Sequence, residues 1–280
     1  AGKKREEKQK VKLREMLAVL KDNRAMQMHI ITGVSDKLAQ QTGSQQIINT
    51  LINGVLIGSY VASQMVNNVS LGVGIVFLFF GGFFIAKWGA KKTTVIWSWL
   101  SIAVAVVTIL FCLFLGGPEG MKKIGVMGVP VIIYTVLTLL KSSASMVLTA
   151  TNGARAADVT DYEYMRSGNY LPAVVSATYS FIDKAVSSLG SLVATGCVAL
   201  VGYVNTVPQM GDKATWPIFW MGMFLMFGLP ILGWILNVIS MKFYILDKEK
   251  MVEVQKTLAE RKKEVEAMEA EAAKESSDEA

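Results

Sequence analysis

Histidine and cysteine are almost missing from this chain, which has one His and two Cys among its 280 residues. These three residues cannot supply the four Cys and His ligands of a structural zinc cluster, and the two Cys lack metal-ligand spacing. Cys112 and Cys197 both fall in apolar stretches, so we interpret them as small packing residues rather than as a disulfide framework. The sequence also shows no Gly-rich phosphate loop and no nucleophile–base pair, which makes an enzyme the poorest interpretation.

Charged residues are scarce too, at 18%, whereas 52% of the residues are hydrophobic. The charges gather in residues 1–24 and 242–280 and leave the middle of the chain nearly uncharged. This distribution is typical of a polytopic membrane protein with polar ends. We therefore predict an all-α membrane protein with a basic cytoplasmic arm (1–24), a six-helix transmembrane domain (25–245) and a charged cytoplasmic helical tail (246–280). The predicted spans are 26–57, 62–86, 95–116, 124–149, 171–203 and 217–242, of which the first and fifth are long enough to be tilted or broken.

The 28 Lys and Arg residues are unevenly divided between the two sides of this topology. With six spans, the arm, the loop around 87–92 and the tail share one side, and only Lys122, Lys123 and Lys213 lie in loops on the other. The positive-inside rule then places both termini in the cytoplasm of a multi-pass cell-membrane protein. The net charge of +6 reflects this orientation, and no basic face interleaved with aromatic residues indicates nucleic acid.

The fifth predicted span contains two adjacent ionisable residues, Asp183 and Lys184. A charge at membrane depth costs at least about 2.5 kcal/mol, so it normally faces a cavity or a partner on a substrate or ion path. Small polar residues recur on the same helix face: Ser176, Ser180, Ser187, Ser191 and Thr195. We predict a transport lysine in a polar-lined helix; the alternative is an Asp–Lys pair that only snorkels or stabilises the fold.

The first predicted span is unusually polar. Its polar residues form two neighbouring helical rows, Thr32, Asp36 and Gln40 in one and Lys37, Gln41 and Ser44 in the other. Hydroxyls, amides and opposite charges together suit a sugar, which needs both donors and acceptors. The alternative is that this segment is an interfacial loop partly outside the membrane.

A third intramembrane cation, Lys141, falls in the fourth predicted span. We expect it to pair with Asp36 or Asp183, because an unpaired charge in a low-dielectric interior is costly. Three lysines against two aspartates leave one positive charge over, and that excess would face a carboxylate on a part of the protein outside this chain.

The two ends of the chain carry alternating charges. Residues 5–22 predict a short amphipathic helix on the membrane surface. Residues 246–272 are strong helix formers, and we expect a solvated single helix; a partner-binding coiled coil is the alternative, although its apolar seam is thin. A basic arm that runs straight into a span favours an internal loop, so the chain is interpreted as a fragment.

Two segments resemble known transporters. The loop from Gly82 to Lys92, with Lys87, Gly89 and Lys91, resembles the cytoplasmic signature loop of the major facilitator superfamily, although Ala86 stands where that motif has an acid. The segment Ala-Asp-Val-Thr-Asp-Tyr at 157–162, followed by a span with a lysine, resembles the glycoside–pentoside–hexuronide:cation symporter family, the melibiose permease relatives.

This second resemblance covers residues 20 to 245 and implies the C-terminal six helices of a twelve-helix transporter, built from inverted three-helix repeats. It implies cation-coupled sugar uptake by alternating access, with the coupling-cation carboxylates (for sodium or a proton) on the N-terminal six helices and no cofactor bound here. Lys184 lies at the distance from Asp161 where the family has an important lysine. Thr149, Tyr179 and Ser180 depart from the melibiose branch, which implies a different sugar.

From the residues and the resemblance together, two groups of functional residues are predicted. The substrate-binding group is Asp36, Lys37, Gln40, Gln41, Lys141, Thr149, Tyr179, Ser180, Asp183 and Lys184. The gating group is Gly82, Lys87, Gly89, Lys91, Lys92, Arg155, Asp158 and Asp161. Within it, Arg155, Asp158 and Asp161 are expected to form ion pairs in the cytoplasmic loop after the fourth span. The expected partners are the sugar, the coupling cation, the lipid bilayer and the N-terminal half of the same transporter. The alternatives are a non-transporting membrane scaffold or sensor, and a transporter of another small solute.

Overall fold

The computed structural model describes residues 13–168 and 171–278, and within them the side chains except at 13–15, 71 and 265–278. All elements in these ranges are helical. In chain order they are α1 (Leu13–Asp22), α2 (Arg24–Gly43), α3 (Gln46–Asn49), the π-helix η1 (Thr50–Leu56), α4 (Tyr60–Trp88), α5 (Ala90–Phe114), α6 (Gly117–Met121), the 3-10 helix η2 (Lys122–Gly125), α7 (Val129–Ser167), α8 (Pro172–Ser187), α9 (Leu189–Leu200), α10 (Trp216–Met223), the π-helix η3 (Phe224–Gly228), α11 (Leu229–Phe243) and α12 (Lys248–Asp278). The predicted all-α membrane fold is confirmed. Most of the basic arm, residues 1–12, lies outside the described residues.

Within the part of the chain that the structure describes, five helical stretches are long and apolar enough to cross a membrane. They are Tyr60–Trp88, Ala90–Phe114, Val129–Ser167, Pro172–Leu200 and Trp216–Phe243. The region of the first predicted span is different, because its helix is interrupted at Ser44 and Gln45 and only the part from Gln46 to Leu56 is apolar. Its crossing of the membrane stays a prediction.

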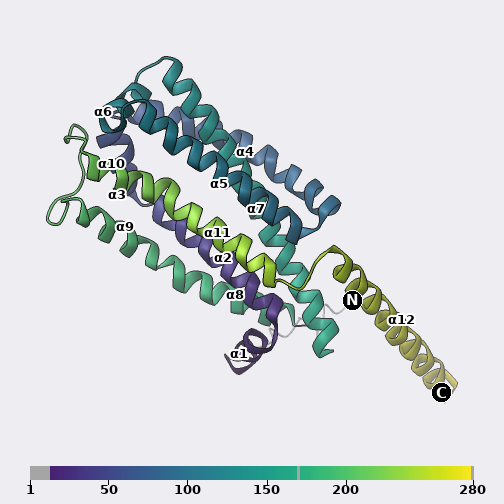
Figure 1. Cartoon of the computed structure of the whole chain (residues 1–280). Coiled ribbons are helices and arrows are strands. Elements are labelled where there is room, and N and C mark those ends of the chain that lie inside the picture. Colours follow the sequence, from purple (N-terminus) through teal and green to yellow (C-terminus); the bar gives the residue numbers. More distant parts are fainter. Residues whose placement is uncertain (1–12, 169–170, 279–280) are drawn as a thin grey trace.

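The long helices lie roughly side by side in one bundle (Figure 1). α2 packs against α11 on one side and against α8 and α9 on the other, while α7 packs against α4 and α5. Helices α6 and α10 lie at one end of the bundle, called here the α6 end; α1, the last turns of α7 and the start of α12 lie at the opposite end, called the α12 end (Figure 1). The functional side chains described below lie between these two ends.

Two apolar cores formed by the described residues hold the bundle together. The larger core joins α4, α5, α7, η1 and the α10–α11 helix, with fully buried side chains such as Leu56, Phe219 and Phe227. A second core at the α12 end joins α1, α2, α7 and α8 around Val19, Val159 and Tyr244. The amphipathic helix predicted within residues 5–22 is described over α1, where Val19 points into this second core.

The tail is not a fully solvated helix as expected. Val254 on α12 is completely buried, and Gln255 Nε2 donates to the Asp161 carboxylate of α7 at 2.6 Å. Arg261 also donates to the carbonyl of Tyr164 at 3.2 Å. The first turns of α12 are therefore docked on the end of α7, because one apolar side chain and two long polar side chains find partners there.

Candidate functional site

A cavity of about 530 Å³, called the first cavity, lies between α2, α7, α8 and the η3–α11 region. Its wall combines hydrogen-bond donors and acceptors, some of them charged, with apolar side chains. The polar lining residues are Asp36, Lys37, Gln40, Lys141, Ser145, Thr149, Asn152, Tyr179 and Asp183. The volume falls within the range typical of small-molecule sites, about 300–1,000 Å³.

The structure brings seven of the ten predicted substrate residues to this cavity, all except Gln41, Ser180 and Lys184. Residues 179 and 183 are four apart on α8 and share the face toward the cavity, whereas residues 180 and 184 lie on the neighbouring, exposed face. Gln41 faces α9, since a Cβ atom at Gly190 would lie 2.8 Å from the Gln41 Cβ. Substrate binding by all ten residues stays a prediction.

Asp36 is bound by an amide and not by a lysine, so the expected Asp36–lysine pairing is wrong in this structure. Asn237 on α11, which is fully buried, donates through Nδ2 to both carboxylate oxygens at 3.0 Å. Gly233 allows this close approach, because a Cβ there would lie 3.3 Å from the Ser35 carbonyl oxygen. Sequence reasoning missed Asn237, although a lone Asn inside an apolar span is a signal of a buried polar contact.

Lys141 likewise has no carboxylate partner among the described residues, so its expected pairing with Asp36 or Asp183 is also wrong. Its ammonium lies 3.4 Å from the carbonyl oxygen of Met226 and 4.8 Å from the ring centroid of Phe227. Both partners belong to η3, whose wider turns are a feature often found at functional sites. An ammonium has three donors, so Lys141 keeps donors for a ligand in the first cavity.

Tyr179 forms the floor of the first cavity toward the α12 end. Its ring stacks on His29 with centroids 4.7 Å apart, and its hydroxyl accepts a hydrogen bond of 3.0 Å from Asn152 Nδ2. The ring fits only because α2 has a glycine at position 33, where a Cβ would lie 2.3 Å from the Tyr179 hydroxyl oxygen. The hydroxyl proton itself stays available for a ligand. The sequence did not indicate His29, Asn152 or Gly33 as neighbours of Tyr179.

Behind this floor lies Arg155, a guanidinium that is only 1% exposed. It donates to the hydroxyls of Thr94 and Thr151 and, at 3.3 Å, to the Asn152 carbonyl oxygen. The expected ion pairs between Arg155 and Asp158 or Asp161 are wrong in this structure, because no carboxylate of the described residues lies within ion-pairing distance of Arg155.

The charges around Arg155 still influence one another. Burial raises the pKa of the nearby Tyr244 phenol well above its ordinary value; the Asp158 carboxylate adds to this rise and the Arg155 charge offsets part of it. Tyr244, which follows the end of α11, therefore stays protonated and neutral at physiological pH.

The segment that carries these residues is not the loop expected after the fourth span. Residues 150–167 continue α7 as a helix to Ser167. Thr151, Arg155, Val159 and Glu163 are all buried, and their spacing of four places them on one face. The segment is helical because this face packs against other helices. The charged residues 158 and 161 lie on its other faces, so the sequence alone suggested a polar loop.

The predicted signature loop is a turn of one residue between α4 and α5. Gly89 has φ = 81°, a conformation that favours glycine, and it ends α4 and begins α5. Lys248 of α12 donates to the carbonyls of Ala86 and Lys87 at 3.2 and 3.0 Å, which satisfies the end of α4. Lys87 and Gly82 are exposed, as is Lys92, whereas Lys91 is half-buried. The gating role of these residues stays a prediction.

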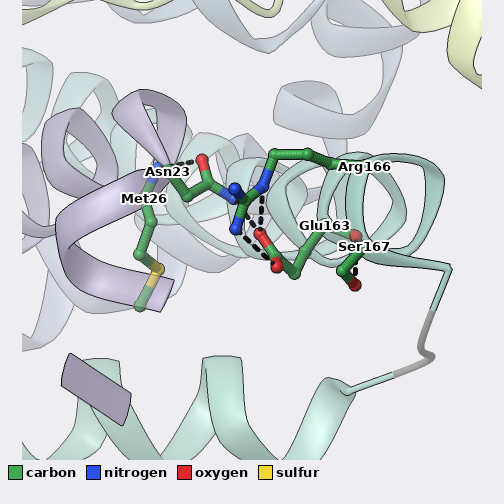
Figure 2. Close-up of polar contacts among 5 residues, drawn as sticks. All are labelled: Asn23, Met26, Glu163, Arg166 and Ser167. Carbon is green, nitrogen blue, oxygen red and sulfur yellow. Dashed lines mark hydrogen bonds and ion pairs between the residues drawn. The ribbon is translucent and has the colours of Figure 1, made fainter. Parts of the chain in front are cut away.

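A polar cluster joins the start of α2 to the end of α7 (Figure 2). Glu163 is 2% exposed and accepts from Arg166 through Nε and Nη2 at 3.1 and 2.9 Å. It also accepts from Asn23 Nδ2 at 2.8 Å, while Asn23 Oδ1 accepts from the Met26 backbone N–H and caps α2. One carboxylate therefore fixes the N-terminus of α2 to α7.

Replacing Glu163 with Leu should destabilise the bundle by about 1–3 kcal/mol, because the buried Asn23 amide loses its acceptor. Thermal unfolding of the purified protein in detergent measures this loss. Glu119→Leu is the matched control, since the Glu119–Lys122 pair is exposed and contributes at most about 1 kcal/mol. Equal unfolding temperatures for the two variants would contradict the assigned role of Glu163.

The chain was compared with curated proteins and with protein-family models. No curated protein matches it. The family model described as MFS/sugar transport protein matches residues 1–248, which is most of the chain. A bundle of membrane-length helices around a polar cavity is the architecture that such a transporter needs. The chain thus belongs to the MFS/sugar transport protein family, and it is a multi-pass membrane transporter of the major facilitator type.

Proposed function

We propose that this chain is the C-terminal half of a cation-coupled sugar symporter that works by alternating access. The observation that carries the proposal is the first cavity, which is lined by several helices and contains two acids, two lysines, amides, hydroxyls and a phenol. Ring hydroxyls of a sugar both donate and accept hydrogen bonds, so they can use every one of these groups.

The apolar part of the wall supports a sugar as well. Trp234 and Tyr179 both line the first cavity, and an aromatic face can cover the C–H surface of a sugar ring while its polar edge makes a hydrogen bond. Lys141 and Asp36 would then bind hydroxyls on opposite sides of the ring, since they lie on α7 and α2. Pocket walls of this mixed kind fix the orientation of a small ligand.

The coupling cation, sodium or a proton, is proposed to bind on the N-terminal six helices, as the resemblance implies. The other half would close the first cavity, and Lys184, exposed on α8 beside Asp183, would respond to its charges. The Lys and Arg bias supports a cytoplasmic α12 end. Asp158, Asp161 and the turn at Gly89 would form the cytoplasmic gate, in which small energies suffice because about 1.4 kcal/mol changes a conformational ratio tenfold.

Uptake into membrane vesicles from cells that express the full-length protein tests the proposal. Labelled mono- and disaccharides are offered with an imposed sodium or proton gradient, and wild type should accumulate at least one of them. Lys184→Ala should abolish accumulation while leaving membrane insertion intact, since the side chain is exposed and fills no core. Lys122→Ala, on the exposed surface at the α6 end, is the matched control and should transport like wild type.

The possible results separate the alternatives. Accumulation by wild type and by Lys184→Ala alike would remove Lys184 from the mechanism. Transport of no sugar under either gradient, from a protein that is correctly inserted, would overturn the symporter and favour the scaffold or a transporter of another solute.

A further inference from the structure

A second cavity, of about 250 Å³, adjoins the first on the side of the α6 end. It lies between the α2–α3 break, η1, α4 and α7. Gly43 and Met226 line both cavities, so the two spaces are neighbours that share part of their wall. A ligand larger than the first cavity would therefore extend into the second.

The chemistry of the second cavity differs from that of the first. Its polar wall consists of amides and hydroxyls, including Asn49, Asn53, Asn67 and Thr138, and none of the described residues that line it is charged. The first cavity, in contrast, contains four charged side chains. Amides that both donate and accept can bind neighbouring hydroxyls of a neutral sugar without the desolvation cost of a buried charge.

These amides keep hydrogen-bonding capacity for a ligand. Asn53 Nδ2 donates to the Asn49 side-chain oxygen, and the Asn53 side-chain oxygen and the Asn49 amide donors have no partner among the described residues. Asn67 on α4 is exposed toward this space and has no hydrogen bond with the described residues. The second cavity thus presents donors and acceptors from two separate helices.

Irregular helices build the boundary between the cavities. The break after Gly43 and the π-helix η1 shape one wall of the second cavity, and η3 supplies Met226. The Met226 sulfur accepts from the Tyr134 hydroxyl at 3.7 Å, and its carbonyl faces Lys141. Methionine is the most adaptable apolar side chain, so Met226 can change rotamer to admit a ligand that spans both spaces.

We propose that the second cavity is a subsite for a neutral glycosyl unit, so that the substrate is an oligosaccharide with one unit in the first cavity and the next in the second. This inference rests on the proposed sugar transport. It predicts that substitutions in the second cavity change the binding of disaccharides and trisaccharides but not the binding of monosaccharides.

The test measures initial uptake into vesicles by the full-length protein. The probes are three labelled series, namely glucose, maltose and maltotriose; xylose, xylobiose and xylotriose; and galactose with its disaccharide and trisaccharide relatives melibiose and raffinose. Asn67→Leu is the main variant, because the side chain is exposed and its loss leaves folding intact. Its neighbour Asn68→Leu is the matched control, since Asn68 is also exposed on α4 but does not line the cavity.

We expect Asn67→Leu to lower kcat/KM for the transported disaccharide about tenfold, as the loss of one or two hydrogen bonds predicts, with monosaccharide uptake within about twofold of wild type. Asn53→Leu should do the same, and Asn68→Leu should match wild type throughout. Equal effects on mono- and disaccharides, no effect on either, or transport of monosaccharides only would overturn the subsite and leave sugar transport standing. Uptake of no probe by wild type would overturn the proposed function, and the subsite with it.

Discussion

Lys141→Met should reduce sugar uptake by roughly 10- to 150-fold while the protein stays folded. The ammonium lies in the wall of the first cavity with a carbonyl and an aromatic ring as its partners and with no carboxylate among the described residues. Its free donors are available to a substrate hydroxyl, and a hydrogen bond to a charged group contributes about 1.5–3 kcal/mol. Methionine keeps most of the volume of lysine, so the packing against Phe227 is retained.

Initial rates in vesicles, normalised to the amount of inserted protein, measure this effect. Lys242→Met is the matched control, because Lys242 is exposed in the last turn of α11 and lies outside the first cavity. The control should transport like wild type. Uptake by Lys141→Met at the wild-type rate would show that the first cavity does not bind the substrate through this lysine.

Arg155→Met should separate stability from transport, with uptake lowered at least about tenfold and the unfolding temperature unchanged or higher. Removal of a buried charge by an apolar side chain of similar size is often neutral or stabilising. The hydroxyls of Thr94 and Thr151 keep acceptors of their own, the carbonyls of Ala90 and Leu148. The loss falls on Asn152, whose carbonyl oxygen would no longer be held by Arg155.

Transport is expected to depend on Asn152 because its amide donates to the Tyr179 hydroxyl at the floor of the first cavity. Without Arg155 the amide can turn over and offer its oxygen to Tyr179 instead. Vesicle uptake and thermal unfolding in detergent are measured together, and Arg155→Lys is included to keep the charge without the planar fork. A large fall in unfolding temperature, with normal transport per folded molecule, would make Arg155 a purely structural residue.

The helical periodicity of polar residues predicted part of the site well. Asp36, Gln40 and Lys37 on one segment and Tyr179 and Asp183 on another were identified from spacing and from the resemblance, and they meet at the first cavity. A row of polar groups inside an apolar span must face something other than lipid, and this requirement can be read from the chain alone.

The partners of these residues could not be predicted in the same way. Asp36 and Lys141 were expected to neutralise each other or another charge, but Asp36 binds Asn237 and Lys141 lies against η3. A sequence with opposite charges in its spans suggests that they pair, wherever they lie in the chain. A neutral amide becomes the partner of a charge only where packing brings it within hydrogen-bond distance, and the sequence does not show where this happens. Gly33 and Gly233, which permit two of these approaches, have no sequence signal because their role depends on the neighbouring helix.

The amino-acid sequence by itself determined that this protein is an all-α membrane protein, that it has polar rows in two of its helices, and that it resembles sugar transporters. The first two properties follow from hydropathy and helical period, and the resemblance follows from the segments 82–92 and 157–162; all of these signals are local in the sequence. Only the tertiary structure decided that residues 150–167 extend α7, that α12 docks on Asp161, and that Arg155 is buried among hydroxyls. Each of these outcomes depends on hydrogen bonds between buried polar groups that are distant in the sequence. A local sequence pattern does not show which of these groups come into contact.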